Sequence, residues 1–180
     1  MINFIFMLLI SVEPKVLANR DYVPGMVELF DSSEKTIDIM MFSAGYYPTY
    51  PDGINQVLYK SLIRAKERGV KVRIILDASS WNPSNTRRNV MVADFFKRNG
   101  IEEVYFDPPE VTTHTKAMIV DSTKCVIGST NWSFYALAHN NETSVLIESN
   151  SLASEMLRIF NDLLSLSTKE LPSMEEEEEE

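Results

Sequence analysis

The chain has 180 residues, of which 44% are hydrophobic and 24% are charged, a balance typical of one globular domain rather than of a disordered or fibrous protein. Its formal net charge is −9, and six of the negative charges lie in the run 175–180, so that without this run the net charge is −3. This mild acidity argues against a broad, electrostatically driven nucleic-acid surface, but it leaves room for a local basic strip beside a cleft.

The two ends of the chain differ in composition from the rest. Residues 1–12 are mostly apolar and carry no charge, but they are too few to span a bilayer as a helix. We therefore treat 1–18 as a separate segment with two interpretations: a signal or membrane anchor, with Ala18 near a cleavage site, or an extra strand. The first makes the protein exported or membrane-associated, and the second is compatible with a cytoplasmic protein. Residues 169–180 are expected to form an acidic, disordered tail, which leaves 19–168 as the folded domain.

Between these segments, apolar spacing predicts alternating helices and strands. In chain order they are a helix over about 21–34, a strand over 36–42, a helix over 54–68, a strand over 70–76, a helix over 86–98, a strand over 104–106, a hairpin of 116–121 and 124–128, a short helix over 132–138, a strand over 143–148 and a helix over 152–166. Asp21 is a candidate N-cap of the first helix, and Gly69 ends the second. The alternation predicts an α/β sandwich with a mixed sheet flanked by helices on both faces.

The hairpin carries an unusual set of polar residues. His114 and Lys116 are two positions apart, so in a strand their side chains face the same side. The second strand then leads to a small polar turn that contains Ser129 and Asn131. An imidazole, an ammonium, a hydroxyl and an amide that converge on one spot are suited to binding and attacking a phosphate group.

This spacing resembles the HxKxxxxD…GSxN signature of the phospholipase D superfamily, with Asp121 at the acidic position and Gly128 opening the second half. The resemblance extends from about Leu17 to Leu166, and it implies the α-β-α sandwich of that superfamily and hydrolysis of a phosphodiester. The reaction scheme needs no cofactor and no metal, and the sequence offers no convincing set of metal ligands.

Each candidate site residue has an expected role. His114 is expected to be the nucleophile that forms a phosphohistidine intermediate, while Lys116 and Asn131 stabilise charge on the phosphoryl group. Ser129 either donates to the phosphate or the histidine network, or serves only as a turn residue. Asp121 is expected to cap the turn that follows it, and a direct part in proton transfer is the weaker alternative.

The resemblance also points to Glu142, because superfamily members carry an acidic residue at a similar place that orients the histidine. We therefore expect the Glu142 carboxylate to accept the second ring N–H of His114. The alternative is an exposed glutamate at the edge of a strand.

A single histidine is too few for this chemistry, because the leaving oxygen also needs a proton donor. The only other histidine in the chain, His139, lies outside the signature. The simplest arrangement is a homodimer in which two His114 residues face each other across one shared site, as is implied for superfamily members with one motif per chain.

The substrate is less closely specified than the reaction. Tyr46, Tyr47 and Tyr50 in the turn-rich loop and the Arg87-Arg88 pair favour an endonuclease that acts on single-stranded or non-specific DNA or RNA. A phospholipid phosphodiesterase, acting for example on cardiolipin, is the alternative, and the apolar N-terminus supports it if that segment binds a membrane. A module that holds phosphate without cleaving it is the third interpretation.

Overall fold

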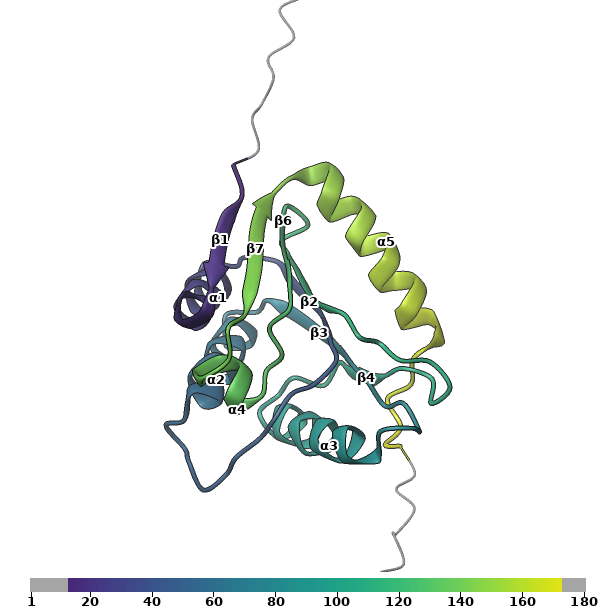
Figure 1. Cartoon of the computed structure of the whole chain (residues 1–180). Coiled ribbons are helices and arrows are strands. Elements are labelled where there is room, and N and C mark those ends of the chain that lie inside the picture. Colours follow the sequence, from purple (N-terminus) through teal and green to yellow (C-terminus); the bar gives the residue numbers. More distant parts are fainter. Residues whose placement is uncertain (1–12, 173–180) are drawn as a thin grey trace, which may run out of the picture.

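A computed structural model describes residues 13–172, so the predictions for 1–12 and 173–180 lie outside the described residues (Figure 1). The strands are β1 (Lys15–Ala18), β2 (Thr36–Met41), β3 (Lys71–Leu76), β4 (Val104–Phe106), β5 (Lys116–Val120), β6 (Lys124–Gly128) and β7 (Thr143–Glu148). The helices are the 3-10 turn η1 (Asn19–Asp21), α1 (Tyr22–Asp31), α2 (Ile54–Glu67), α3 (Pro83–Arg98), α4 (Phe134–Ala138) and α5 (Asn150–Leu166).

All seven strands belong to one mixed sheet, in the order β1-β7-β6-β5-β2-β3-β4. The strands β2, β3 and β4 are parallel, and they are joined through helices α2 and α3. The strands β5, β6, β7 and β1 are antiparallel to their neighbours, so the antiparallel part adjoins the parallel part along the β2–β5 pair. The predicted mixed sheet is confirmed.

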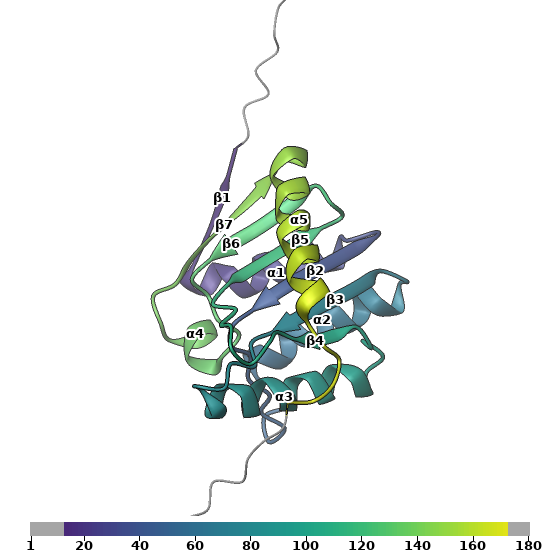
Figure 2. The same cartoon turned by 90° about the vertical axis from the view of Figure 1, so that its right-hand side faces the viewer.

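Helices cover both faces of this sheet, also as predicted. Residues of α1, α2 and α3 pack with one face of the strands into the larger apolar cluster, and α5 packs with the other face into a smaller one. In Figure 2, α5 crosses in front of the strands, while α1 and α2 lie behind them. Because side chains alternate along a strand, neighbouring residues enter different clusters: Ile39 and Met41 of β2 join the larger one, and Met40 joins the smaller one.

Several helix starts differ slightly from the sequence expectation, and the N-cap positions of two helices are informative. Helix α3 begins at Pro83 instead of about residue 86, because the Asn82 side chain accepts the N–H of Asn85 (3.3 Å) and caps the helix, and proline is well suited to the first helical position. Asp21 lies at the N-cap position of α1 but makes no side-chain capping bond, since its own backbone is already helical as part of η1.

The N-terminal segment contributes a strand. Lys15–Ala18 forms β1 at the edge of the sheet and pairs antiparallel with β7, from Lys15 opposite Leu146 to Ala18 opposite Thr143. Leu17 is buried in the larger apolar cluster. The folded part therefore includes residues on the N-terminal side of the predicted boundary at 18.

Asp121 has a structural role that differs from the one expected. It lies with Ser122 in the β5–β6 turn, and both residues have positive φ (52° and 57°). Its carboxylate does not cap this turn but accepts the backbone N–H groups of Glu34 (3.0 Å), Lys35 (2.7 Å) and Thr36 (3.0 Å) just before β2. Partial burial alone would raise the pKa of Asp121, but these three donors outweigh it and hold the pKa below its ordinary value.

Replacing Asp121 by Asn should destabilise the fold, because the neutral amide is a weaker acceptor than the carboxylate for the three N–H groups. Asn tolerates positive φ, so the substitution adds no backbone strain. We expect the free energy of unfolding, measured by urea denaturation at pH 7, to fall by about 1–2 kcal/mol. The folded-state pKa is below the unfolded one, so the wild-type advantage is complete above the unfolded pKa and is lost as pH falls through the folded pKa. A stability difference that did not change on acidification would contradict this role.

Candidate active site

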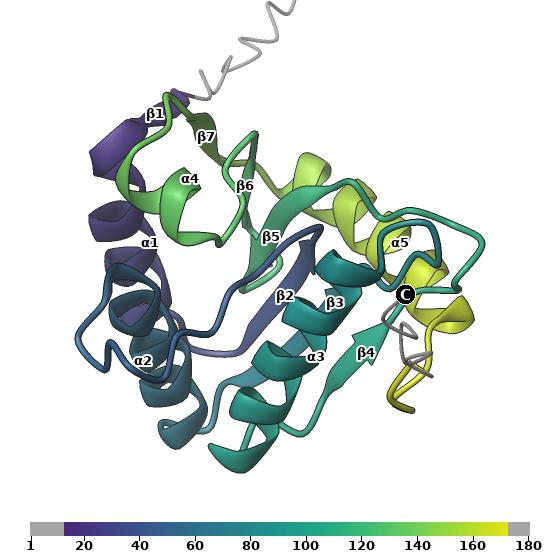
Figure 3. The same ribbon diagram turned by 60° about the horizontal axis from the view of Figure 1, so that its bottom comes forward.

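The segments that carry the predicted phosphate-binding residues lie at the end of the sheet where β2 and β3 finish and β5 begins. Figure 3 shows β5, β2 and β3 side by side. Two backbone hydrogen bonds fix this arrangement: the Phe42 N–H donates to the Thr115 carbonyl (2.9 Å), and the Trp132 N–H donates to the Ser43 carbonyl (2.8 Å). The segments that carry His114 and Asn131 therefore flank the same Phe42-Ser43 dipeptide. The two halves of the signature come together as the sequence predicts.

The loop that carries His114 is held by two buried carboxylates. The backbone N–H of Thr113 donates to Asp107 (2.8 Å) and lies 3.1 Å from an oxygen of Asp77. Asp77 also accepts the hydroxyl of Ser79 (2.9 Å), and Asp107 accepts the N–H of Ala78 (2.6 Å). The backbone before His114 is thereby tied to the ends of β3 and β4.

Phe42 contacts both the His114 imidazole and the Lys116 ammonium. Its ring centroid is 4.5 Å from that of the His114 imidazole, with the planes tilted by 58°, and 4.8 Å from the Lys116 ammonium nitrogen. The Lys116 ammonium also donates to the carbonyl oxygen of His114 (2.7 Å). A cation over an aromatic face and beside a carbonyl is held in place without being neutralised.

The electrostatics of Lys116 follow from its burial. The residue is 7% exposed, and burial lowers the pKa of its ammonium, although the nearby carboxylates of Glu142 and Asp77 raise it in part. His114, by contrast, is exposed, and its ring makes no hydrogen bond within residues 13–172. A desolvated cation next to an accessible imidazole is suited to an anionic ligand that the imidazole can attack.

Glu142 is positioned differently from the expectation. Its carboxylate accepts the Ser129 hydroxyl through a short contact and the Asn140 side-chain amide (3.1 Å), and not the ring N–H of His114. Ser129 in turn accepts the N–H of Thr143 (3.1 Å). The expected Glu142–His114 bond is thus not formed within the described chain, because local partners occupy the carboxylate. Ser129 joins this network instead of being a turn residue only.

Asn131 has a fixed backbone and a side-chain oxygen that is buried without a hydrogen-bond partner in the described residues. Its neighbours are both buried: the Thr130 hydroxyl lies 3.1 Å from that of Ser144, and the Trp132 indole donates to the Tyr22 hydroxyl (3.0 Å). Gly128 allows this packing, since a Cβ there would lie 2.1 Å from the Ser144 hydroxyl oxygen. A buried amide that lacks a partner is free to bind a ligand.

Asp121 does not belong to this cluster. It follows the last residue of β5, whereas His114 precedes the first, so the whole strand separates the two. Its carboxylate is already occupied by the three backbone donors before β2. The hydrogen bonds that Asp121 makes in the structure are therefore structural ones.

Sequence reasoning missed three residues that shape the site: Phe42, Asp77 and Asp107. Asp77 left a recognisable signal, because it directly follows a buried parallel strand, and ligand sites of α/β sheets lie beyond the carboxyl ends of their strands. Phe42 gave no such signal, since a phenylalanine after an apolar strand is expected in the core.

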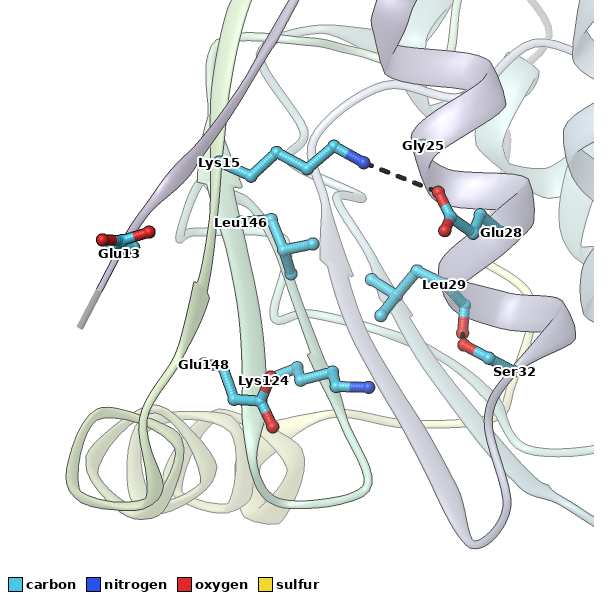
Figure 4. Close-up of a pocket in the computed structure, with 9 residues that line it drawn as sticks. All are labelled: Glu13, Lys15, Gly25, Glu28, Leu29, Ser32, Lys124, Leu146 and Glu148. Carbon is cyan, nitrogen blue, oxygen red and sulfur yellow. Dashed lines mark hydrogen bonds and ion pairs between the residues drawn. The ribbon is translucent and has the colours of Figure 1, made fainter. Parts of the chain in front are cut away.

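Other features lie away from the cluster. A cavity of about 270 Å³ between β1, β6, β7 and α1 is lined by charges of both signs, among them Lys15, Glu28 and Lys124, with Lys15 bonded to Glu28 at 3.5 Å (Figure 4). Lys124 begins β6, so this cavity lies at the opposite end of the β5–β6 hairpin from His114. Cys125, in β6, is buried.

Residues 13–172 contain neither a candidate metal centre nor a helix that could span a membrane. No group of three or more His, Cys, Asp or Glu side chains is arranged to hold a metal ion. Within the same residues, none of the helices has the length and the apolar composition needed to cross a membrane.

Comparison with known proteins gives consistent matches. Residues 26–164 match the family model described as cardiolipin synthase, PLD-like domain. The chain is 26% identical over 149 residues to the virion nicking-joining enzyme of vaccinia virus, which covers 81% of this chain and 34% of that protein. It is 35% identical over 98 residues to a phospholipase D of Rickettsia conorii, covering 54% of this chain and 46% of the relative. The chain thus spans between a third and a half of the length of these relatives.

The fold has a counterpart among solved structures. Nuc from Salmonella typhimurium, a phospholipase D family member, superimposes with a TM-score of 0.70 at 24% identity, over 87% of this chain and 97% of that one. NucT from Helicobacter pylori gives 0.68 at 16% identity, over 88% and 99%. These structures show the fold, and the family match over most of the chain shows that it belongs to the phospholipase D-like family.

Proposed function

We propose that the protein is an endonuclease that hydrolyses phosphodiester bonds of single-stranded or non-specific DNA or RNA, with His114 as nucleophile in a site shared by two subunits. The observation that supports this proposal best is the pairing of an accessible His114 imidazole with the desolvated Lys116 ammonium, both in contact with Phe42. The scheme uses side chains alone, so we expect turnover in the presence of EDTA.

The reaction is a double displacement at phosphorus. In the first step a neutral His114 ring nitrogen forms a bond to phosphorus, the bond from phosphorus to the leaving oxygen breaks, and this oxygen takes a proton from the protonated His114 of the partner subunit. In the second step that imidazole, now neutral, takes a proton from water, whose oxygen attacks phosphorus and displaces the first His114. The phosphomonoester is released and both imidazoles return to their starting state.

Lys116 and Asn131 supply the charge stabilisation that this reaction needs. Equatorial phosphoryl oxygens gain or redistribute negative charge in the transition state, and a fixed ammonium counters it without moving. The side-chain amide of Asn131 can direct its N–H donors at the same oxygens. Ser129 and Glu142 contribute further polar groups to the site, and the hydrogen bonds from Ser129 to Glu142 and from Thr143 to Ser129 fix their positions.

The shared site is proposed because one chain contains only one suitable imidazole. His139 ends α4 and packs on Phe134 and Tyr135, with ring centroids 5.2 and 5.7 Å away. It therefore belongs to the α4 surface and not to the hydrogen-bonded network around His114. A two-fold axis beside His114 would bring a second imidazole to the phosphate.

Nucleic acid is the substrate that we favour, although the relatives support both candidates. The vaccinia relative is a nicking-joining enzyme, whereas the rickettsial relative is a phospholipase D. Phospholipid hydrolysis therefore remains the second candidate, and assays on both substrates with the same variants decide between them.

His114→Ala should abolish turnover of a small chromogenic phosphodiester, with a loss of at least about 10³-fold in kcat because the nucleophile is removed. The matched control is His139→Ala, which removes the only other histidine and should leave turnover of this small substrate unchanged. Both variants are assayed in EDTA and compared by circular dichroism. Equal rates for wild-type and His114→Ala protein would refute the proposal.

The pH–rate profile should have an alkaline limb below pH 10.5, the ordinary pKa of a lysine. Activity needs the charged ammonium, and burial lowers the pKa of Lys116, so the charge is lost as pH rises through this lowered value. In Lys116→Arg the guanidinium stays charged, so the limb should move to higher pH even if kcat falls. An alkaline limb at the same pH in both proteins would show that another group causes it.

A mixed dimer tests the shared site directly. Two differently tagged chains, one wild-type and one His114→Ala, are co-expressed and purified through both tags. If each reaction needs both imidazoles, the mixed dimer should have less than about 1% of wild-type activity on the chromogenic diester. Half of the wild-type activity would mean that each subunit works alone, and a fully active monomer in sedimentation would exclude sharing.

A further inference from the structure

A second cavity, of about 480 Å³, plays no part in the chemistry described so far. It lies between the loop after β2, the start of α2 and the start of α4. Four aromatic residues and two amides line it: Tyr47, Tyr50, Phe134, Tyr135, Asn55 and Gln56. Its volume is in the range of cavities that bind small organic groups.

The aromatic walls are rigid yet largely open to solvent. The rings of Tyr47 and Phe134 meet edge to face, with centroids 6.4 Å apart, and the Phe134 N–H donates to the Tyr47 hydroxyl (3.4 Å). Tyr50 and Tyr135 are 68% and 69% exposed. Flat apolar faces held open in this way can stack on a planar ligand.

The two amide side chains that line the cavity, Asn55 and Gln56, differ in their hydrogen bonding. The Asn55 amide donates to the Trp132 carbonyl (2.6 Å), which fixes its orientation. The neighbouring Gln56 is only 5% exposed and lines the cavity, yet its side chain makes no hydrogen bond within residues 13–172. The atoms of this amide are not among the fully buried, unpaired ones, so they reach the solvent of the cavity, where a ligand with both donors and acceptors on one edge can pair with them.

This combination favours one kind of occupant. An acyl chain or an apolar protein surface would cover the rings but would leave the Gln56 amide desolvated and unpaired. A nucleobase has a flat face for the rings and a polar edge for the amide, which is how proteins bind unstacked bases.

The cavity also lies within reach of the reacting phosphate. Phe134 is three residues after Asn131, so their Cα atoms are at most about 11 Å apart. On the other wall, Tyr47 is five residues after Phe42, the residue that contacts the His114 ring. A nucleotide next to the phosphate held at His114 can therefore place its base here.

We propose that this cavity is a base-binding subsite that takes one unstacked nucleobase beside the scissile phosphate, stacked on the aromatic walls and hydrogen-bonded by Gln56. The inference rests on the proposed nuclease function and deepens it, because a base in a duplex is already stacked and paired. The subsite accordingly selects single-stranded nucleic acid over duplex and over phospholipid.

Tyr135→Ala and Gln56→Leu test the subsite by removing the stacking face and the amide separately. For a single-stranded oligonucleotide, Tyr135→Ala should raise KM about 5- to 100-fold, the range for the loss of one base–aromatic stack, and Tyr135→Phe should restore it. Neither Tyr135→Ala nor Gln56→Leu should change turnover of the small chromogenic diester, because this substrate has no base. Leu166→Ala, at an exposed position on α5 on the opposite face of the sheet, is the control for loss of a large surface side chain.

Direct binding provides a readout that does not depend on catalysis. In the His114→Ala background, fluorescence anisotropy with a labelled oligonucleotide should show the same loss of affinity for Tyr135→Ala, and a preference for single strand over duplex that this variant lacks. Unchanged KM and affinity in both pocket variants would overturn the subsite while leaving the nuclease intact. If wild-type protein did not hydrolyse the small diester at all, the proposed function itself would fail.

Two other outcomes would also overturn the base-binding proposal. If Tyr135→Ala impaired only the hydrolysis of cardiolipin vesicles, the cavity would bind lipid. If the same substitution converted a dimer into a monomer in sedimentation, the cavity would be a contact between subunits.

Discussion

The backbone amide of Thr113 is the point on which the active site depends. It lies between the buried carboxylates of Asp77 and Asp107, at the ends of two parallel strands, and it fixes the residue directly before His114. Burial raises the pKa of Asp107, and the neighbouring Asp77 charge raises it further. The hydrogen bonds donated by Thr113 and Ala78 act in the opposite direction and favour the ionised carboxylate. Without this anchor, other contacts would have to offset the conformational entropy that is lost when the loop carrying His114 becomes ordered.

The structure divides the signature between two tasks. His114, Lys116 and Asn131 lie at one end of the β5–β6 hairpin, where His114 is exposed and Lys116 is buried. Asp121 lies at the other end, where it fastens the chain before β2 to the hairpin turn. The same short motif therefore sets the chemistry at one end of the sheet and the registry of β2 against β5 at the other.

The sequence was sufficient for the elements, the sheet type and the convergence of the two halves of the motif, because these depend on local spacing and on one hairpin. It was insufficient where a side chain had a choice of partners. Glu142 could have bonded to His114, but Ser129 and Asn140 are nearer along the strand and loop and occupy its carboxylate. Phe42 and Asp107 contact the site through pairings of β2 with β5 and β3 with β4, and residue type alone does not disclose such long-range contacts.

The exposed imidazole of His114 has a consequence for when the protein can act. Among residues 13–172 of one chain, the ring has no hydrogen-bonded partner to fix its tautomer, and no second imidazole lies against it. With the proposed shared site, a newly synthesised or highly diluted chain is inert, and activity rises with the square of the concentration until the pairs are complete. Assembly would then serve as a safeguard, because a degradative enzyme of this design becomes active only where its copies accumulate.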